Sequence, residues 1–245
     1  DDIYPEVLLN MGNEKRKSSG YAQRFFAHFG KAVGTILLVF VISMIIFVCI
    51  FTAYLRNYLM PQVTFSLDGF KLNQTSVIYY ENKETGQYET LQNLYGNENR
   101  IWASYNEIPD NLVYATIAIE DKRFLEHHGV DWLRTMRAGM NLFMGSHSTF
   151  GASTLTQQLV KNLTSDDEIT VRRKLVEIFR ALAMEKQYSK EEILEWYLNT
   201  IYLGEQAYGV RTASYTYFAK DVSQLDLAQC ASLIAITNNP SLYDP

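Results

Sequence analysis

The longest run of apolar residues lies near the start of the chain, between Ala32 and Leu55, and it contains no charged residue. As a helix it would be about 36 Å long, at about 1.5 Å per residue, which is enough to cross a bilayer. The segment RNYLMPQ that follows lacks the small-residue cleavage site of a secretory signal peptide. We therefore expect residues 32–55 to form one transmembrane helix, and a buried core helix of this length is the less favoured alternative.

Basic residues are distributed unequally around this segment. The residues that precede it include Lys15, Arg16, Lys17, Arg24 and Lys31. Only Arg56 follows it closely. Because loops with an excess of Lys and Arg stay on the cytoplasmic side of a membrane, we expect residues 1–31 to be a cytoplasmic tail, to which we assign no fold. Everything after residue 56 is then expected to lie outside.

The pattern changes between residues 62 and 106. The runs TSVIYY and QYETLQNLY are rich in β-branched and aromatic residues, and the polar stretch ENKETG lies between them. Two such runs joined by a Gly-containing turn are typical of an antiparallel β-hairpin. We therefore expect residues 56–106 to form a juxtamembrane linker that carries a small hairpin.

Helical spacing of apolar residues dominates the rest of the chain. One helix is expected to begin near Pro109, because proline suits a first helical turn. Further helices are predicted over residues 131–144, 153–163, 168–187, 190–200, 206–218 and 225–236. Ser189 and Glu192 have the spacing of a capping box at the start of one of them. Residues 107–245 are therefore expected to form one mainly helical domain.

Composition sets further limits. The apolar share of 47% is enough for a buried core in a chain of 245 residues. The net charge of −5 gives no general reason to expect nucleic acid as a partner, since a basic face would have to be local. Cys49 and Cys230 lie far apart in the sequence, and we expect neither a disulfide nor a cysteine-based metal site.

Glu120 falls on an apolar stripe of the helix that begins near Pro109. The other members of this stripe are Val113, Ile117 and Phe124. Burial without a partner makes a carboxylate a better proton acceptor near neutral pH, which suits a general base. The alternative is a helix-end Glu that pairs with Lys122, Arg123 or another cation. The stretch EDKRFLEHHGVDW that begins at Glu120 gathers more polar groups than a helix end requires, although Asp121 and His127 could be structural.

The stretch GASTLTQQLVKNL, residues 151–163, crowds small residues, hydroxyls and amides into the start of a predicted helix. If Ser153 or Thr154 caps this helix, its first backbone N–H groups can bind an anion, and Lys161 can add a positive charge. The alternative is an ordinary cap in which Gln157 closes a box with Thr154. No Gly-Lys-Ser/Thr triplet follows, so a nucleotide P-loop is not supported.

The stretch VRRKLVEIFRALAMEK is expected to bury one apolar face of a helix. That face consists of Val171, Leu175, Ile178 and Leu182. Arg173, Glu177 and Arg180 fall together on another face, at spacings of three and four residues. Alone they would form a solvated ion-pair ladder. A guanidinium array would also support an anion site at residue 153 and a base at Glu120.

The stretch DWLRTMRAGMNLFMG shows one more apolar pattern at helical spacing. Its members are Trp132, Leu133, Met136, Met140 and Phe143. A core helix is the default interpretation. The alternative is a lipid-facing or lipid-binding surface, with Arg134 and Arg137 at the level of the headgroups.

In this order, these segments resemble the peptidoglycan glycosyltransferase family (glycosyltransferase family 51), the membrane-anchored polymerases of bacterial cell-wall glycan. AIEDKRFLEHHGVDW resembles the family's Glu-Asp-x-x-Phe-x-x-His-x-Gly motif, and GASTLTQQLVKN its Gly-x-Ser-Thr-x-Thr-Gln-Gln motif. RRKLVEIFRALAMEK resembles its Arg-Lys-x-x-Glu motif. The resemblance covers about residues 107–245. Ala152, Met184 and Gln229 depart from residues that are frequent in the family, and none of them removes a group that we consider catalytic.

The resemblance implies a lysozyme-like helical fold and the polymerisation of lipid II. A glycan chain on undecaprenyl pyrophosphate would be the donor, and transfer to the 4-hydroxyl of the acceptor GlcNAc would invert the anomeric carbon. Glu120 would be the general base. Glu177 would be the second important acid, which either orients cations or holds a divalent ion such as Mg²⁺ or Mn²⁺. The implied substrate-binding residues are Asp121, Phe124, His127, Ser153, Thr154, Gln157, Gln158, Lys161, Arg173 and Lys174.

The resemblance also implies a location and partners. The chain would be a single-pass protein of the bacterial cytoplasmic membrane with its catalytic domain outside, and its partners would be lipid II, the growing glycan strand and the membrane. Cell-wall synthesis or division proteins are further candidates. Neither Ser-x-x-Lys nor Lys-Thr-Gly, the motifs of the penicillin-binding transpeptidase, occurs, so we expect the N-terminal part of a longer class A penicillin-binding protein. The alternatives are a lysozyme-like hydrolase and a catalytically silent anchor that recruits partners.

Overall fold

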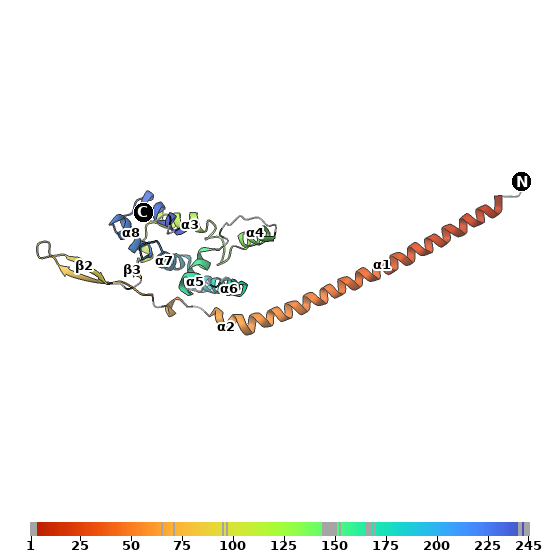
Figure 1. Ribbon diagram of the computed structural model, residues 1–245, viewed down its shortest axis with the longest axis horizontal. Coiled ribbons are helices and arrows are strands. Elements are labelled where there is room, and N and C mark those ends of the chain that lie inside the picture. Colours follow the sequence, from red (N-terminus) through yellow and green to blue (C-terminus); the bar gives the residue numbers. More distant parts are fainter. Residues whose placement is uncertain are drawn as a thin grey trace. The chain divides into compact units, whose positions relative to one another are not determined.

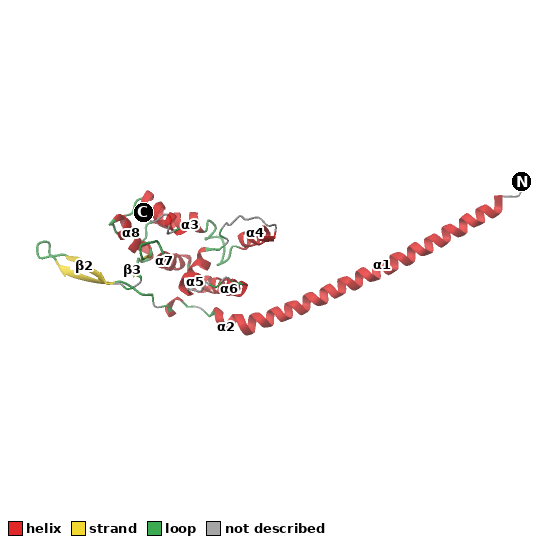
Figure 2. Cartoon of the chain, viewed as in Figure 1, coloured by secondary structure: helices red, strands yellow, loops and turns green. Residues whose placement is uncertain are grey.

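The computed structural model describes residues 4–64, 66–70, 72–94, 96, 98–143, 151, 153–164, 168, 170–239 and 242 (Figure 1). The chain divides into two compact units, Asp1–Pro61 and Gln62–Pro245. The described part of the first unit is helical, and the second combines a β-hairpin with a set of shorter helices (Figure 2). The mainly helical fold class predicted from the sequence is confirmed.

The first unit is dominated by helix α1 (Tyr4–Tyr54), and the apolar side chains of α1 between residues 28 and 53 are exposed. The stretch His28–Val63 is long and apolar enough to cross a membrane. α1 also includes most of residues 1–31, to which the sequence analysis assigned no fold. No proline occurs between Pro5 and Pro61, so nothing in the sequence breaks the helix on the N-terminal side of the apolar segment.

A π-helical turn, Leu55–Leu59, follows α1 and precedes α2 (Met60–Val63). α2 contains Pro61, which has no amide hydrogen and whose ring crowds the carbonyl group four residues earlier. The wider π-helical turn accommodates this crowding without ending the helix. The helical path therefore continues beyond the predicted end at residue 55.

Strands β1 (Ser76–Glu81) and β2 (Tyr88–Leu94) pair antiparallel, as expected from the two β-branched and aromatic runs. A bulge lies between Ile78 and Tyr79. In the connecting turn Gly86 has a φ of +66°, a conformation that glycine adopts more readily than other residues. The predicted hairpin with its Gly-containing turn is confirmed.

The helical part of the second unit consists largely of α3 to α9. Their bounds are Asp110–Glu120 (α3), Trp132–Phe143 (α4), Leu155–Thr164 (α5), Val171–Gln187 (α6), Lys190–Thr200 (α7), Val210–Phe218 (α8) and Leu227–Ala235 (α9). α3 packs against α9, and α5 packs against both α6 and α7. The core between them includes Leu112, Phe124, Leu159 and Leu198. The predicted capping box of Ser189 and Glu192 is present at the start of α7.

A short parallel pair, β3 (Asn99–Arg100) with β4 (Ala207–Tyr208), joins the linker to the loop before α8. The predicted helix over residues 206–218 is wrong at its start, because α8 begins only at Val210. Gly209 has a φ of +85°, which lies outside the helical region. Strand pairing therefore replaces the helical pattern over the first residues of the predicted element.

The buried face of α6 differs from the predicted one. The predicted residues are exposed or half-buried: Val171, Leu175, Ile178 and Leu182. The face that α6 buries consists of Val176, Glu177, Ala181 and Met184. Gly129 gives the physical reason, because a Cβ added to it would lie 2.6 Å from the carbonyl oxygen of Ala181. The backbone of the turn between α3 and α4, which contains Gly129, thus lies close to α6 at Ala181, and the face of α6 that carries Ala181 is buried.

Helix α4 does not belong to the core. Its exposed apolar side chains are Trp132, Leu133, Met136 and Met140. The default interpretation as a core helix is therefore wrong, because helical spacing reveals an apolar face without revealing what covers it. The lipid-facing alternative stays a prediction. The side chain of Phe143 and the predicted helix end at residue 144 lie outside the described residues.

Candidate active site

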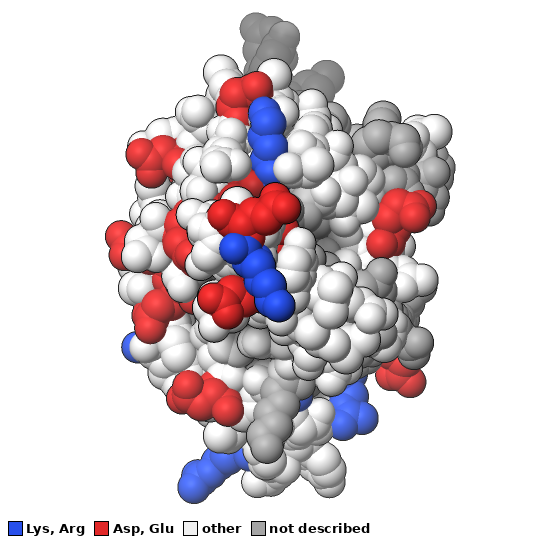
Figure 3. Space-filling model, turned by 90° about the vertical axis from the view of Figure 1, so that its left-hand side faces the viewer, with Lys and Arg blue, Asp and Glu red and all other residues white. Residues whose placement is uncertain are grey.

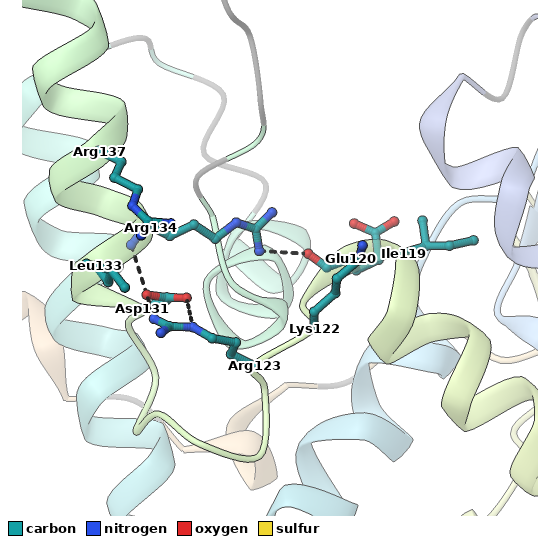
Figure 4. Close-up of a pocket in the computed structure, with 8 residues that line it drawn as sticks. All are labelled: Ile119, Glu120, Lys122, Arg123, Asp131, Leu133, Arg134 and Arg137. Atoms are coloured by element: carbon teal, nitrogen blue, oxygen red, sulfur yellow. Dashed lines mark hydrogen bonds and ion pairs between the residues drawn. The ribbon is translucent and has the colours of Figure 1, made fainter.

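Glu120 is the last residue of α3, and its half-buried side chain lines a cleft of about 420 Å³. The cleft lies between the end of α3, the turn that follows it and the first turns of α4 (Figure 4). Its lining residues are Ile119, Glu120, Lys122, Arg123, Asp131, Leu133, Arg134 and Arg137. Half of them are cationic, which is a local concentration of positive charge in a chain whose net charge is −5.

Charges are arranged differently on another face of the molecule. In Figure 3, Asp and Glu side chains are spread among uncharged residues, and Lys and Arg side chains stand singly. The face drawn there shows no continuous basic patch among the described residues. The clustering of cations is therefore a property of the Glu120 cleft rather than of that face.

Both carboxylate oxygens of Glu120 have neutral hydrogen-bond donors. Nε2 of Gln158 donates to Oε2 at 2.9 Å, and the hydroxyl of Thr237 donates to Oε1 at 2.6 Å. The sequence left two interpretations open, and the first of them, a buried carboxylate without a partner, is not seen because the turn after α9, a helix that packs on α3, places Thr237 next to Glu120. The alternative of an ion pair with a neighbouring cation is not seen among the described residues either, because Arg123 pairs with Asp131.

Arg134 connects several segments at the cleft. Its guanidinium donates to the backbone carbonyl of Glu120 at 3.1 Å (Figure 4) and to that of Gly151 at 2.6 Å. The same group lies 3.7 Å from Oδ1 of Asp121. A planar guanidinium presents donors in fixed directions and can serve separate acceptors at once. Arg134 therefore holds the end of α3, the start of α4 and residue 151 in one arrangement.

Asp131 precedes α4 and is almost fully buried. It accepts hydrogen bonds from Nε of Arg123 at 2.8 Å and from the amide of Arg134 at 2.9 Å. Burial alone would raise the pKa of Asp131, but these bonds outweigh burial, and the pKa of Asp131 is lowered. Asp131 therefore stays ionised at neutral pH and fixes Arg123 at the wall of the cleft.

Asp121, Phe124 and His127 are buried in the turn after α3. Oδ2 of Asp121 lies 2.9 Å from Nε2 of His127 and accepts from the backbone amide of Leu155 at 3.1 Å. Phe124 belongs to the hydrophobic core. These contacts fix the turn that follows Glu120 against the start of α5. The geometry thus gives the three residues a positioning role rather than a surface for contact with a ligand.

The start of α5 carries the capping box of the ordinary-cap alternative. The amide of Thr154 donates to Oε1 of Gln157 at 3.0 Å, and the amide of Gln157 donates to the hydroxyl oxygen of Thr154 at 3.2 Å. The next amide, that of Leu155, donates to Asp121. The amides of Leu155 and Gln157 are therefore not open to an anionic ligand. The protein itself supplies the acceptors of these two amides, and one of them is the carboxylate of Asp121, placed where the helix dipole favours negative charge.

A second group of charges lies at α5 and α6. Nζ of Lys174 donates to the hydroxyl oxygen of Ser153 at 2.8 Å and forms an ion pair with Glu177. Nη1 of Arg173 lies 3.1 Å from the other carboxylate oxygen of Glu177. A narrow crevice is lined by the charged side chains of Lys161, Arg173, Glu177 and Arg180. The structure thus brings Lys161 together with the predicted guanidinium array.

Glu177 fits the orientation of cations better than the binding of a divalent ion. Its two carboxylate oxygens accept from Arg173 and Lys174, and a metal ion at the same oxygens would face these positive charges. Within the ranges that the structure describes, no group of three Asp, Glu, His or Cys side chains is placed to hold a metal ion.

Sequence reasoning missed residues near Glu120. Thr237 lies in a turn after α9, where no helical pattern assigns it to a face. Tyr197 is buried on α7, and its hydroxyl lies 3.4 Å from Oε1 of Gln158. Burial, followed by the negative charge of Glu120, raises the pKa of Tyr197 well above its usual value. The apolar pattern of α7 indicates that Tyr197 is buried, but it cannot indicate which residue its hydroxyl meets.

Comparison with known proteins extends these observations. A family model described as transglycosylase matches residues 87–245. Penicillin-binding protein 1A of Clostridium perfringens (strain 13 / Type A) is 43% identical over 177 residues, which are 71% of this chain and 25% of that protein. Penicillin-binding protein 1A of Escherichia coli (strain K12) is 45% identical over 151 residues, 62% of this chain and 18% of that protein. Penicillin-binding protein 1A/1B of Bacillus subtilis (strain 168) is 36% identical over 236 residues, 95% of this chain and 24% of that protein.

The chain spans about a quarter or less of the length of these relatives. The family model covers the end of α3, the start of α5 and all of α6, so the Glu120 cleft and the charges around Glu177 both fall within it. The family resemblance inferred from the motifs is confirmed. The chain belongs to the transglycosylase family.

Proposed function

We propose that the chain is a peptidoglycan glycosyltransferase that lengthens glycan strands from lipid II. The observation that carries this proposal is the carboxylate of Glu120, which is held by neutral donors at the wall of a cationic cleft. Further cations surround Glu177. An acid close to fixed positive charges suits a reaction in which a hydroxyl loses its proton while a pyrophosphate departs.

In this reaction Glu120 accepts the proton of the acceptor GlcNAc 4-hydroxyl. The hydroxyl oxygen attacks the anomeric carbon of the donor, and the new glycosidic bond forms as the bond to undecaprenyl pyrophosphate breaks. The electron pair of the broken bond leaves with the pyrophosphate. Attack from the face opposite the leaving group inverts the anomeric carbon. A base whose oxygens are both held in place needs little rearrangement before the proton is transferred.

Lys161, Arg173 and Lys174 are the proposed partners of the departing pyrophosphate. Lys161 and Arg173 line the same crevice, and Lys174 is held by Ser153 and Glu177. Positive groups stabilise a developing negative charge most effectively when they are fixed before the charge appears. In this proposal Glu177 fixes Arg173 and Lys174 and takes no part in proton transfer.

The other motif residues keep the base in position. Asp121, Phe124, His127, Thr154 and Gln157 hold the turn after α3 against the start of α5. Gln158 binds the carboxylate of Glu120 directly. Lys122 and Arg137, which line the cleft, suit the phosphates of the second lipid-linked substrate.

We also propose a single-pass arrangement in the bacterial cytoplasmic membrane, with the N-terminus inside and residues 107–245 outside as the glycosyltransferase domain. The apolar stretch His28–Val63 and the basic residues that precede it support this arrangement. The exposed apolar face of α4 suits contact with lipid, with Arg134 and Arg137 at the level of the headgroups. Such contact would keep lipid-linked substrates close to the cleft.

The test of this function is incubation of the detergent-solubilised chain with labelled lipid II, followed by separation of the products on a gel. We expect a ladder of lengthened glycan strands. The same chain incubated with finished glycan distinguishes the alternatives, because strands cut to shorter lengths would identify a hydrolase. Bound lipid II that remains unchanged, with finished glycan also intact, would overturn the proposed activity in favour of a silent anchor.

A further inference from the structure

The surroundings of Glu120 contain one donor that can also accept. Nε2 of Gln158 lies next to Oε2 and belongs to an amide NH2 group, which donates hydrogen bonds but does not accept them. The hydroxyl of Thr237, which meets Oε1, has one proton and also has lone pairs. One carboxylate oxygen of Glu120 is therefore bound by a group that can only donate a hydrogen bond, and the other by a group that can donate or accept one.

The Thr237 hydroxyl has a choice of acceptors. Its oxygen lies 2.6 Å from Oε1 of Glu120 and 2.7 Å from the backbone carbonyl oxygen of Ile234. A hydroxyl donates one proton at a time, so only one of these contacts receives it. When Glu120 is ionised, the proton of Thr237 points to Oε1. When Oε1 carries a proton, it donates to the hydroxyl oxygen, and the Thr237 proton turns to the carbonyl of Ile234.

The orientation of the Gln158 side-chain amide is set by the buried residue Tyr197. The hydroxyl of Tyr197 lies 3.4 Å from Oε1 of Gln158, at the long end of hydrogen-bond distances. The buried Tyr197 keeps its proton and donates, so the amide oxygen of Gln158 faces Tyr197 and its nitrogen faces Glu120. The amide nitrogen of Gln158 therefore stabilises Glu120 in its ionised form. When Glu120 is protonated, the hydroxyl of Thr237 at Oε1 can accept the proton in a hydrogen bond, whereas the amide nitrogen of Gln158 cannot.

On the basis of the proposed function, we propose that Thr237 is a positioning residue for Glu120, which holds the base in one place before and after it takes the proton. It donates to the ionised carboxylate and accepts from the neutral acid, and its own proton alternates between Oε1 of Glu120 and the carbonyl of Ile234. The proton from the acceptor sugar thus ends on Oε1. No atom of Thr237 is consumed, and the original state returns when Glu120 releases its proton to water.

The test replaces the hydroxyl and then restores it. Thr237→Val keeps the shape of the side chain without the hydroxyl, and Thr237→Ser returns the hydroxyl. We expect Thr237→Val to lower the kcat of lipid II polymerisation about tenfold or more, the loss expected for one hydrogen bond to a charged group. KM should change little, because Thr237 is assigned no contact with substrate. Thr237→Ser should recover most of the wild-type kcat.

Thr216→Val is the matched control, because the hydroxyl of Thr216 also bonds a backbone carbonyl, that of Thr212, within a different helix. Melting temperatures separate folding from chemistry, and Thr237→Ala replaces the valine variant if that variant melts early. A wild-type kcat in the folded valine or alanine variant would overturn the inference, and so would a serine variant as slow as the valine variant. Failure of the wild-type chain to polymerise lipid II would instead overturn the proposed function, so the two failures are distinguishable.

Discussion

At the residue scale, the carboxylate of Glu120 is oriented without losing its charge to an ion pair. Its partners Gln158 and Thr237 are neutral. The guanidinium groups nearby are directed elsewhere, since Arg134 bonds backbone carbonyls and Arg123 bonds Asp131. In the proposed reaction, a carboxylate that is oriented by neutral donors beside a cationic cleft suits a base that accepts a proton from a substrate that carries phosphates.

Lys161 lines the crevice between α5 and α6, and its proposed contact with the pyrophosphate can be tested separately. Lys161→Ala should weaken the binding of undecaprenyl pyrophosphate, the proposed leaving group, about tenfold, as expected for the loss of one charge-assisted contact. Titration calorimetry with the solubilised chain measures this affinity. Lys186→Ala, at an exposed lysine on α6, is the control and should bind as the wild type does. Equal affinity of the Lys161→Ala and wild-type chains would remove Lys161 from the pyrophosphate site.

The site residues differ in how far the sequence could predict their partners. Arg173 and Glu177 meet at a spacing of four residues, which a helical pattern contains directly. Glu120 meets Gln158 and Thr237, which lie 38 and 117 residues away in the sequence. Those contacts depend on how α5 and α9 pack, and no local pattern contains that information. The pattern of α3 predicts that Glu120 lies on an apolar stripe, but it does not predict which residues donate hydrogen bonds to its carboxylate.

At the element scale, helical spacing predicted where helices occur better than which face they bury. α6 turns a small residue, Ala181, toward the close approach of Gly129, while its larger apolar residues are half-buried or exposed. α4 exposes its apolar residues. Both differences have one origin, because the burial of a face depends on the neighbours that pack on it and not on the face alone.

The packing of Gly129 on α6 can be tested by substitution. Gly129→Ala should destabilise the protein by about 2–4 kcal/mol, because the new Cβ would clash with a backbone carbonyl that cannot move freely, at a φ of +89°. Chemical unfolding of the solubilised chain measures this loss. Gly86→Ala is the control, since its φ is +66° and nothing lies within 4 Å of the added Cβ. It should cost only about 1 kcal/mol of backbone strain. Equal losses in the two variants would contradict the close approach.

The exposed face of α4 predicts contact with lipid. In vesicles whose lipids carry brominated acyl chains, part of the tryptophan fluorescence should be quenched, because Trp132 is 55% exposed on this face. Trp102 and Trp196 pack edge to face, with ring centres 5.0 Å apart, and are half-buried, so they should be quenched less. Trp132→Phe should abolish most of the quenching. Quenching that persists in this variant would show that α4 does not meet the membrane.

At the scale of the whole molecule, the chain combines an apolar helical stretch with a helical domain of the transglycosylase family. The order of apolar helix, hairpin and shorter helices could be predicted from the sequence because each of these elements has its own local pattern. The cleft could not, since it forms only where α3, the following turn and α4 meet. An enzyme held at a membrane meets lipid-linked donors and acceptors in the same layer, which is the advantage that the proposed arrangement offers.

The most direct test of the central claim compares the wild-type chain with Glu120→Gln in the polymerisation of labelled lipid II. Glutamine has nearly the same shape but cannot take up the proton of the acceptor hydroxyl. The account predicts long glycan strands from the wild type and none from Glu120→Gln, with lipid II binding and melting temperature close to those of the wild type. Glycan strands formed by Glu120→Gln at the wild-type rate would contradict the assignment of Glu120 as the base.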